Sequence, residues 1–368
     1  MSSTCESGKV DPPQVAVVLS GWPRASEVFA VNEVLALHGA GMLAGVFAVK
    51  HDPRSVLQPQ ACVLDPLVHV LPDGEAEEAG AALVDAMAGR RVDAVHGYFA
   101  HRPSEVAAAA ARRLGRPFGF SVHALDARKV SPQELTDRSR EAALVVCCNE
   151  DAVEAVNDVG GRPRLVRHGV DLQRFPATPP PPATADVRLL AVGRLVEKKG
   201  FEVLVEAMGA LAPATRLDVV GDGPEHENLR AAIARHGLGA RVRLLGGVTH
   251  AELPAHYARA DLVVVPSVVD QHGDRDGLPN VVLEAMASAR PVVATTVGAI
   301  AAGVRHGETG LLVPPGDPAA LADAIGALAR DPERRTAFGR AARSRVEADF
   351  DVLQRSSEFC TTLAAAYV

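Results

Sequence analysis

Short apolar runs alternate with amphipathic stretches along the whole chain. Most of these runs do not alternate apolar with polar residues, which is typical of parallel strands covered by helices on both faces. The succession of strands and helices is the βαβ rhythm of a doubly wound sheet. In the first half the predicted strands are QVAVVLS (14–20), LAGVFAV (43–49), VDAVHGYF (92–99), PFGFSVH (117–123), ALVVCCN (143–149) and PRLVRHG (163–169). The predicted helices are SEVFAVNEVLALHGAG (26–41), EEAGAALVDAMAGRR (77–91), PSEVAAAAARRLG (103–115) and EDAVEAVNDVG (150–160).

A proline-rich segment, FPATPPPPATADV (175–187), divides the chain. Its four successive prolines can continue neither a helix nor a central strand, so we interpret it as a semi-rigid linker. The rhythm then restarts with strands at VRLLAVG (187–193), TRLDVVG (215–221), VRLLG (242–246), DLVVVPS (261–267), PVVATTV (291–297) and TGLLVPP (309–315). Predicted helices cover 200–211, 226–237, 251–260, 280–289 and 318–330, and from about Asp331 the pattern predicts consecutive helices only.

The fold class is therefore α/β, with two Rossmann-like, doubly wound domains, as a length of 368 residues also favours. We expect a disordered N-terminus over 1–12, a first domain over 13–175, a linker over 176–187 and a second domain over 188–350. The last helix, 351–368, is predicted to pack back on the first domain.

Composition excludes several classes of protein. With 38 basic and 45 acidic residues the formal net charge is −7, which argues against a broad nucleic-acid-binding surface. No stretch predicts a signal peptide or a transmembrane helix, although peripheral membrane contact stays open. The five cysteines form no CxxC motif, which favours a reducing, cytoplasmic location and argues against a disulfide framework or a zinc site. We expect Cys147 and Cys148 to pack in or beside a strand.

In open α/β sheets, ligands bind outside the carboxyl ends of the strands, so the loops there are the candidate site. GRLVEKKG (193–200) places Arg194 and Lys199 at the head of a helix, which suits a diphosphate. Lys198 is interpreted as a solvated surface charge. In GDGPEHENL (221–229), Gly221 and Gly223 fit either a tight turn or nucleotide contact.

HGDRDGLPNVVLEAM (272–286) combines a helix start with two carboxylates. Pro279 is predicted at the first helical position, which leaves the amides of Asn280 and Val281 free to hold an anion. Asp276 and Glu284 would repel an anion but accept hydrogen bonds from hydroxyl groups. Glu284 also lies in an otherwise apolar segment, where an unpaired carboxylate is costly. The ligand is therefore expected to be anionic in the middle and hydroxylated on both sides, as a nucleotide sugar is.

These residues resemble those of the retaining glycosyltransferases of family 4, which have the GT-B fold. The family's Glu-x7-Glu motif corresponds here to Asp276 and Glu284 in DGLPNVVLEAMA. The resemblance covers essentially the second domain, through RHGVDLQRF (167–175), GRLVEKKG, VVGDGP, ARADLVVVPS and GETGLLVPPGDPAALADAI (307–325). The first domain matches more loosely, through PRASEVF (23–29), VHGYFA and FSVHALD.

The resemblance implies roles for single residues. Arg194 and Lys199 would hold the diphosphate and Glu284 the ribose hydroxyls. Asp276 would contact the hydroxyls of the transferred sugar. Gly221, Gly223 and Gly277, with the amides around Asn280 and Val281, would complete the donor site, and His123 would lie beside the sugar. The acceptor-side candidates are Arg24, Glu27, His101 and Asp126; Ser26 is interpreted as the cap of a helix that begins at Glu27.

Two positions depart from the family pattern. Asp276 is one methylene shorter than the commoner Glu, and Pro279 replaces a common glycine and so removes an amide donor. By resemblance the fold needs no bound metal and no cofactor. The expected partners are a nucleotide sugar, with a UDP-sugar first and GDP-, ADP- or dTDP-sugars as alternatives, and a small-molecule or lipid-linked acceptor. Transfer of a hexose-type sugar competes with two other functions, a GT-B epimerase or phosphorylase and a catalytically silent sugar-nucleotide-binding module.

Overall fold

The computed structural model describes residues 11–22, 27–51, 59–123, 126–127, 130–181 and 186–368. Most of the expected disordered N-terminus, and the candidates Arg24 and Ser26, therefore lie outside the described residues. No helix among the described residues has the length and apolar character needed to cross a lipid bilayer.

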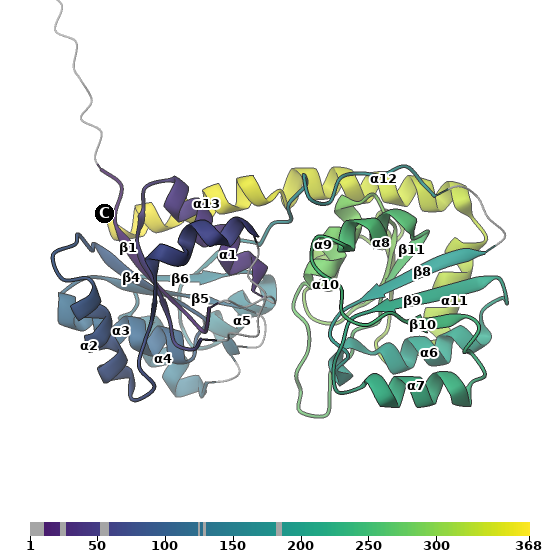
Figure 1. The fold of residues 1–368 in the computed structure, drawn as a ribbon, viewed down its shortest axis with the longest axis horizontal. Coiled ribbons are helices and arrows are strands. Elements are labelled where there is room, and N and C mark those ends of the chain that lie inside the picture. Colours follow the sequence, from purple (N-terminus) through teal and green to yellow (C-terminus); the bar gives the residue numbers. More distant parts are fainter. Residues whose placement is uncertain (1–10, 23–26, 52–58, 124–125, 128–129, 182–185) are drawn as a thin grey trace, which may run out of the picture.

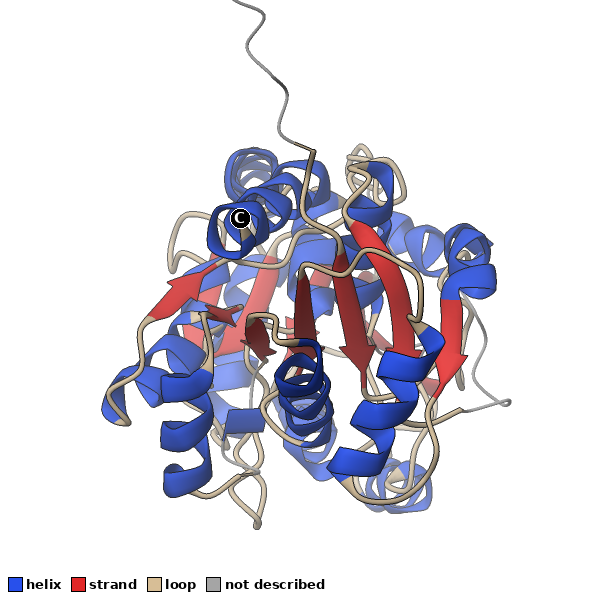
Figure 2. Cartoon of the chain, turned by 90° about the vertical axis from the view of Figure 1, so that its left-hand side faces the viewer, coloured by secondary structure: helices blue, strands red, loops and turns tan. Residues whose placement is uncertain are grey.

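The first domain is built on a seven-stranded sheet with the order β3-β2-β1-β4-β5-β6-β7, in which every pairing is parallel. The strands are β1 (Val15–Leu19), β2 (Leu43–Ala48), β3 (Val68–Val70), β4 (Ala94–Tyr98), β5 (Phe118–Val122), β6 (Leu144–Cys147) and β7 (Pro163–Leu165). All residues of β1, β4, β5 and β6 are buried, which explains their continuous apolar runs. Figure 2 shows helices on both faces of this sheet.

Its helices are α1 (Val28–Gly39), the 3-10 helix η1 (Pro59–Leu67), α2 (Ala76–Ala86), α3 (Arg102–Leu114), α4 (Pro132–Glu141) and α5 (Glu150–Asp158). The sequence pattern does not predict β3, η1 or α4. The helix α4 buries only Leu135, so it has no apolar stripe to detect. Its signal is instead a capping box, in which Ser131 and Glu134 bond each other's backbone amides. The helix α1 begins at Val28, one residue later than expected.

The second domain has a six-stranded parallel sheet with the order β10-β9-β8-β11-β12-β13. Its strands are β8 (Val187–Val192), β9 (Thr215–Val220), β10 (Val242–Leu244), β11 (Leu262–Val265), β12 (Val292–Thr295) and β13 (Gly310–Val313). Its helices are η3 (Glu197–Lys199), α6 (Phe201–Ala210), α7 (His226–Arg235), α8 (Leu253–Arg259), α9 (Asn280–Ala287), α10 (Ile300–Gly303) and α11 (Pro318–Ala329). The predicted α/β architecture of two doubly wound domains is confirmed (Figure 1).

Two C-terminal helices, α12 (Pro332–Asp349) and α13 (Val352–Tyr367), run from the second domain to the first (Figure 1). The first packs against α9 and the second against α1. Phe359, Leu363 and Tyr367 of α13 are buried in the core of the first domain. The Tyr367 hydroxyl lies 2.7 Å from Nδ1 of His96, whose pKa burial lowers to about 3.

The described part of the linker is tied to the second domain by the buried guanidinium of Arg290. It donates hydrogen bonds to the carbonyl oxygens of Tyr257 at 2.9 Å and of Pro179 at 2.8 Å. Burial lowers the pKa of Arg290 to about 10. No described backbone amide donates to the Pro179 carbonyl, so the arginine satisfies a backbone group that would otherwise be costly to bury.

Candidate active site

The site residues lie in loops that follow parallel strands, on the edges where the two sheets face each other. A pocket there is formed by both domains. Phe29 and Asn32 of α1 line it from the first domain, and Asn280 and Glu284 of α9 line it from the second. The segment after β7, with Arg174, completes the wall.

Lys199 and Asp276 form a buried ion pair in this region. The Lys199 Nζ lies 2.9 Å from both carboxylate oxygens of Asp276, and the side chains are only 17% and 9% exposed. The Ser267 hydroxyl donates a further hydrogen bond to Asp276 at 2.6 Å, and Ser267 is itself held through Thr295. The structure thus brings together the carboxylate expected to contact the sugar and the cation expected to hold the diphosphate, and the two neutralise each other.

The neighbouring cations differ from each other. Arg194 is exposed, and its guanidinium makes no hydrogen bond or ion pair to any described residue. Lys198 does not have the solvated position predicted for it. It bonds both carboxylate oxygens of Asp274 at 3.0 Å, because the loop after β11 folds over η3. Arg194 is therefore the cation that can turn toward an incoming anion without breaking a pair.

Gly221 and Gly223 hold two loops in close contact. Gly221 has φ +144°, and a Cβ there would lie 1.8 Å from the carbonyl oxygen of Gly193. Gly223 has φ +158°, and a Cβ there would lie 2.4 Å from the carbonyl oxygen of Leu195. No larger residue fits either position, because the backbone of the loop after β8 lies against both glycines. They also fix the backbone on each side of Arg194.

The start of α9 departs from the prediction by one residue. Pro279 is the N-cap with ψ 138°, so Asn280 and Val281 are the first two helical residues. No described residue accepts a hydrogen bond from either amide, whereas the next one, of Val282, bonds the Pro279 carbonyl at 3.0 Å. The proline ring removes no donor that the helix start needs, and the two free amides remain. Gly277 is buried beside them.

Glu284 is buried and bonded within the pocket, at 6% exposure. Its Oε2 accepts a hydrogen bond of 2.7 Å from the Tyr257 hydroxyl, and its Oε1 lies 3.5 Å from Nε2 of His250. The other ring nitrogen of His250 lies 2.6 Å from the Arg174 guanidinium. Burial, and then the charge of Glu284, raise the pKa of Tyr257, so the phenol stays a donor. Glu284 is therefore oriented as a fixed acceptor.

On the facing domain, His123 pairs with a second histidine that the sequence argument did not single out. Its Nδ1 lies 3.0 Å from Nε2 of His168, and the rings stack with centroids 5.0 Å apart. The Nδ1 of His168 lies 3.1 Å from Oε1 of Glu33. The other carboxylate oxygen of Glu33 accepts a hydrogen bond of 2.8 Å from Tyr98. A continuous chain thus runs from α1 to His123.

The protonation states follow from this chain. Burial alone would lower the pKa of His168, but Cys148 and Glu33 outweigh it and raise the pKa to about 10. Burial, and then the charges of His168 and His96, lower the pKa of His123 well below its usual range. A protonated His168 donates to Glu33 through Nδ1 and to His123 through Nε2. His123 is then neutral, with its proton on Nε2.

This Nε2 atom is buried and has no hydrogen-bond partner in the described part of the chain, which is rare in a folded protein. Three aromatic rings surround His123, those of Phe29, Tyr98 and Phe99, with centroids 4.6, 5.7 and 4.9 Å away. Phe99 has φ +78°, a strained backbone for a bulky residue, and such strain concentrates at functional sites. An unpaired donor among rigid neighbours is suited to a ligand oxygen.

Some of the acceptor-side candidates that the structure describes have structural roles. Asp126 is 3% exposed and accepts the backbone amides of His123 and Ala100, each at 2.6 Å. It therefore positions the His123 loop, and its burial argues against the acceptor contact implied by the resemblance. Glu27 is buried at the N-cap of α1, and His101 occupies the N-cap of α3. Only His101 lies in a second crevice of this domain.

Several of these residues escape sequence reasoning. Glu33 and Phe29 are four residues apart on one face of α1, and Glu33 is a carboxylate in an apolar helix, the same signal that identified Glu284. His168 carries no such signal, since it follows the three-residue strand β7.

One group among the described residues has donor atoms close enough to share a metal ion. The side chains of His123, Cys148 and His168 place one ligand atom each within 4.8 Å of one another. A set of two imidazoles and one thiol suits a soft divalent ion. The ring nitrogens concerned already share a hydrogen bond, so we interpret the group as a proton-sharing pair with a neighbouring thiol.

The fold and the cleft define a class of protein. Two doubly wound domains with ligand-binding loops that face each other form the GT-B architecture. A solved structure titled "Crystal structure of Anabaena Alr3699/HepE in complex with UDP" superposes with a TM-score of 0.80 at 21% identity, over 96% of this chain and 100% of that one. The likeness in architecture extends over both domains.

Family models give the finer assignment. Residues 26–174 match Glycosyltransferase Family 4, and residues 186–331 match Glycosyl transferases group 1. The chain belongs to the family 4 glycosyltransferases with the GT-B fold.

Two curated relatives from Mycobacterium tuberculosis (strain CDC 1551 / Oshkosh) are similar. Glycogen synthase is 32% identical over 219 residues, 58% of this chain and 51% of the relative. The GDP-mannose-dependent alpha-(1-6)-phosphatidylinositol monomannoside mannosyltransferase is 36% identical over 196 residues, 50% of each. The chain thus matches about half the length of these relatives.

Proposed function

We propose that the protein transfers a hexose-type sugar from a nucleotide diphosphate sugar to an acceptor hydroxyl or amine, with retention of anomeric configuration. One observation carries this proposal. Asp276, paired with Lys199, lies in the loop that leads into α9, and the buried acceptor Glu284 lies in α9 itself, whose first two amides bond no described residue. Arg194, which pairs with no described residue, lies in the same loop as Lys199. Cations and amides suit a diphosphate, while fixed carboxylates suit hydroxyl groups.

The reaction breaks the bond between the anomeric carbon and the diphosphate oxygen and forms one to the acceptor oxygen or nitrogen. Negative charge grows on the diphosphate as the bond breaks, and Arg194, Lys199 and the α9 amides stabilise it. Such preorganised donors are worth about 3 kcal/mol each in transition-state stabilisation. The acceptor proton passes to the departing phosphate oxygen, so the products are a glycoside and a nucleoside diphosphate.

The ion pair suggests an order of events. When a diphosphate arrives, Lys199 exchanges part of its contact with Asp276 for a phosphate oxygen. Asp276 then has a free carboxylate oxygen to accept a hydroxyl of the sugar. Binding the donor thus converts an internal ion pair into two contacts with one ligand, which links recognition of the phosphate to recognition of the sugar.

His123 acts from the other domain in this proposal. Its Nε2–H donates to an oxygen of the sugar or of the leaving group, and the hydrogen bond from His168 maintains that tautomer. Glu284 accepts the ribose hydroxyls, and Tyr257 holds its carboxylate in place.

The first experiment identifies the nucleotide sugar that the protein binds. The protein is heated with UDP-, GDP-, ADP- and dTDP-sugars, since a ligand that binds the native state raises the melting temperature. The stabilising donor is then incubated with acceptor pools, and nucleoside diphosphate release and the anomeric configuration of the product are measured. Release that requires an acceptor and gives the donor's configuration supports the proposal. Inversion would refute the retaining mechanism, release without an acceptor would favour an epimerase, and binding without release a silent module.

A further inference from the structure

A second crevice, with a volume of about 370 Å³, opens in the first domain and shares no lining residue with the pocket that contains Glu284. It is lined by the loops after β1, β2, β3 and β4, among them Ser20, Lys50, Asp73 and His101. The sheet order places β1 between β2 and β4, so the chain reverses its direction of winding there. In doubly wound sheets, such a reversal is where ligands bind.

Ser20 gives the crevice an unsatisfied polar group. The residue is only 8% exposed, and its hydroxyl oxygen has no hydrogen-bond partner among the residues that the structure describes. Buried hydroxyls in native proteins nearly always have a partner, and leaving one unpaired lowers stability. A ligand oxygen in the crevice would supply the missing partner.

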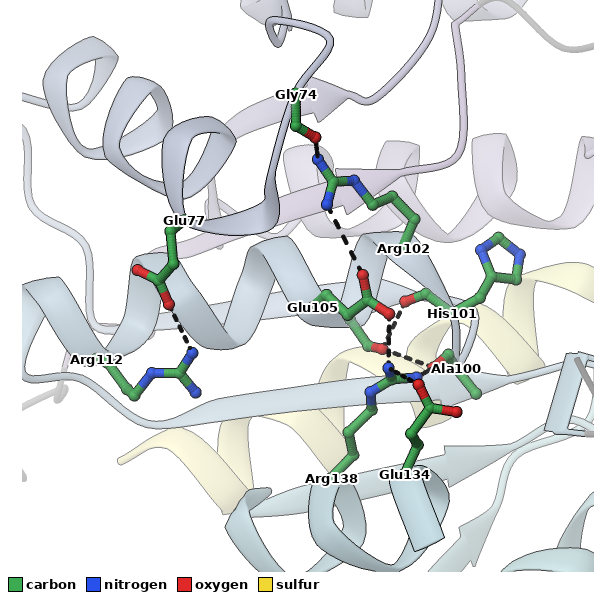
Figure 3. A network of polar contacts seen from close by, with 10 residues as sticks. Gly74, Glu77, Ala100, His101, Arg102, Glu105, Arg112, Glu134 and Arg138 are labelled. Atoms are coloured by element: carbon green, nitrogen blue, oxygen red, sulfur yellow. Dashed lines mark hydrogen bonds and ion pairs between the residues drawn. The ribbon is translucent and has the colours of Figure 1, made fainter. Parts of the chain in front are cut away.

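The charges around the crevice favour an anion. Lys50 is exposed, and its ammonium group bonds no described residue. Arg102 donates to the Gly74 carbonyl and lies 3.8 Å from Glu105, which leaves further N–H groups of its guanidinium available. Figure 3 shows Arg102 between these two partners, with His101 beside it. Asp73 is the one carboxylate among the described lining residues.

The N-terminus of helix α3 adds positive electrostatic potential to the crevice. Helix α3 begins at Arg102, so the positive end of its dipole lies at the crevice. Arg138 pairs with Glu105 at 2.6 Å, so the Glu105 carboxylate is shared between Arg138 and Arg102 (Figure 3).

The crevice is connected to the active site by one residue. The Phe99 ring stacks on His101 with centroids 5.5 Å apart, and it lies 4.9 Å from the His123 ring on its other side. A molecule anchored in the crevice would extend past Phe99 toward His123, where the transferred sugar is proposed to lie.

We infer that this crevice binds a phosphate group, and that the acceptor of the reaction is a phosphorylated molecule held there. The term acceptor rests on the proposed function, whereas phosphate binding does not. Lys50 and Arg102 contact the phosphate oxygens, and Ser20 donates to one of them. The phosphate belongs either to a phosphorylated small molecule or to the headgroup of a lipid.

Trp22, the single tryptophan of the chain, can report on the crevice. Its backbone amide donates to the Lys50 carbonyl at 2.9 Å, and its ring is buried. Tryptophan fluorescence is followed while inorganic phosphate is added. We expect a saturable change. Lys50→Gln should weaken phosphate binding about tenfold or more, the effect of losing one charge-assisted contact. Arg116→Gln, which removes an exposed charge at the end of α3, is the matched control and should leave binding unchanged.

Ser20→Ala keeps the test independent of folding. Removing an unpaired buried hydroxyl should leave the melting temperature the same or higher, yet weaken phosphate binding. Arg194→Gln distinguishes phosphate binding at the proposed donor site of the second domain from phosphate binding in the crevice of the first domain. If phosphate binding is lost in Arg194→Gln and retained in Lys50→Gln, the anion binds at the donor site and the inference is wrong. Absence of a saturable change with any probe also refutes it.

Two further probes distinguish the sources of the phosphate. A tighter, saturable response to glucose 6-phosphate indicates a soluble phosphorylated acceptor. A response confined to phosphatidylcholine vesicles that contain phosphatidylglycerol indicates a lipid headgroup. Binding of the nucleotide sugar, measured separately by melting temperature, shows whether the proposed function holds even if the crevice does not bind phosphate. Retained donor stabilisation with no phosphate response would overturn this inference alone.

Discussion

The Nε2 atom of His168 lies 3.0 Å from Nδ1 of His123, and this contact joins a carboxylate on α1 to His123 within the first domain. The two middle members, Glu33 and His168, each have a defined partner on both sides. Glu33 is fixed by Tyr98, and His168 is fixed by Glu33. The pair therefore determines which nitrogen of His123 carries its proton, so Glu33 and His168 are positioning residues for His123.

Glu33→Gln should reduce turnover about tenfold or more with little change in the KM for the nucleotide sugar. The reason is that a general acid or hydrogen-bond donor such as His123 acts mainly on the transition state. Glutamine can still accept from Tyr98, so the fold is retained. The glutamate raises the pKa of His168, and its loss should move the alkaline limb of the kcat profile to lower pH. The measurement is kcat against pH for both proteins.

His168→Gln tests the same chain from its centre and should reduce kcat similarly. His226→Gln is the matched control, since His226 is an exposed histidine beside Glu227. If His168→Gln and His226→Gln both keep the wild-type pH profile, His168 does not set the tautomer of His123.

Protonation of the same histidines should make stability depend on pH. The pKa of His168 is raised to about 10, so its stabilising contribution is complete below about 6.5, the usual histidine pKa, and is lost as pH rises through about 10. Between these values the free energy of unfolding should fall by about 1.4 kcal/mol per pH unit. His96 and His123 have lowered pKa values and are buried as neutral rings, so stability should also fall as pH drops below about 6.5.

Urea unfolding from about pH 5 to pH 9 measures this dependence. His168→Gln should flatten the alkaline side and leave the acidic side in place, because only His168 has a raised pKa among the three. An unchanged alkaline slope in the variant would contradict the assignment of a protonated His168.

Glu284→Gln should weaken nucleotide binding about tenfold, since a charged acceptor of ribose hydroxyls becomes a neutral one. Tyr257→Phe is the matched variant. It removes the 2.7 Å hydrogen bond but leaves the carboxylate, so it should lower stability by about 1 kcal/mol and weaken nucleotide binding less. Isothermal titration with the nucleoside diphosphate separates the two. A larger effect from Tyr257→Phe would show that Glu284 serves the fold rather than the ribose.

The sequence predicts the architecture well because parallel strands buried on both faces leave continuous apolar runs. It fails for elements with little buried surface, such as β3 with three residues and α4 with one buried leucine. In the site, motifs identify Arg194, Lys199, Asp276 and Glu284. They do not reveal that Lys199 and Asp276 bond each other, because that contact joins loops 77 residues apart.

Residues that act through another residue are the hardest to find. Asp126 resembles an acceptor ligand in sequence but turns out to hold two backbone amides. His168 follows an edge strand and gains its importance only from its distance to Glu33, 135 residues earlier. Without the sheet order, nothing in the spacing brings α1, β5 and β7 together.

Removal of metal should leave turnover unchanged. The resemblance implies a reaction supported by cations of the protein, and we propose that Arg194 and Lys199 neutralise the diphosphate in place of a metal. Initial rates after dialysis against EDTA, with and without added Mg²⁺, measure this, and a loss restored by Mg²⁺ would contradict it.

Added Zn²⁺ is a separate case, because His123, Cys148 and His168 can bind it together. It should inhibit by displacing the proton that the two histidines share. Cys148→Ser should weaken this inhibition, whereas Cys62→Ser, which alters an exposed thiol, should not.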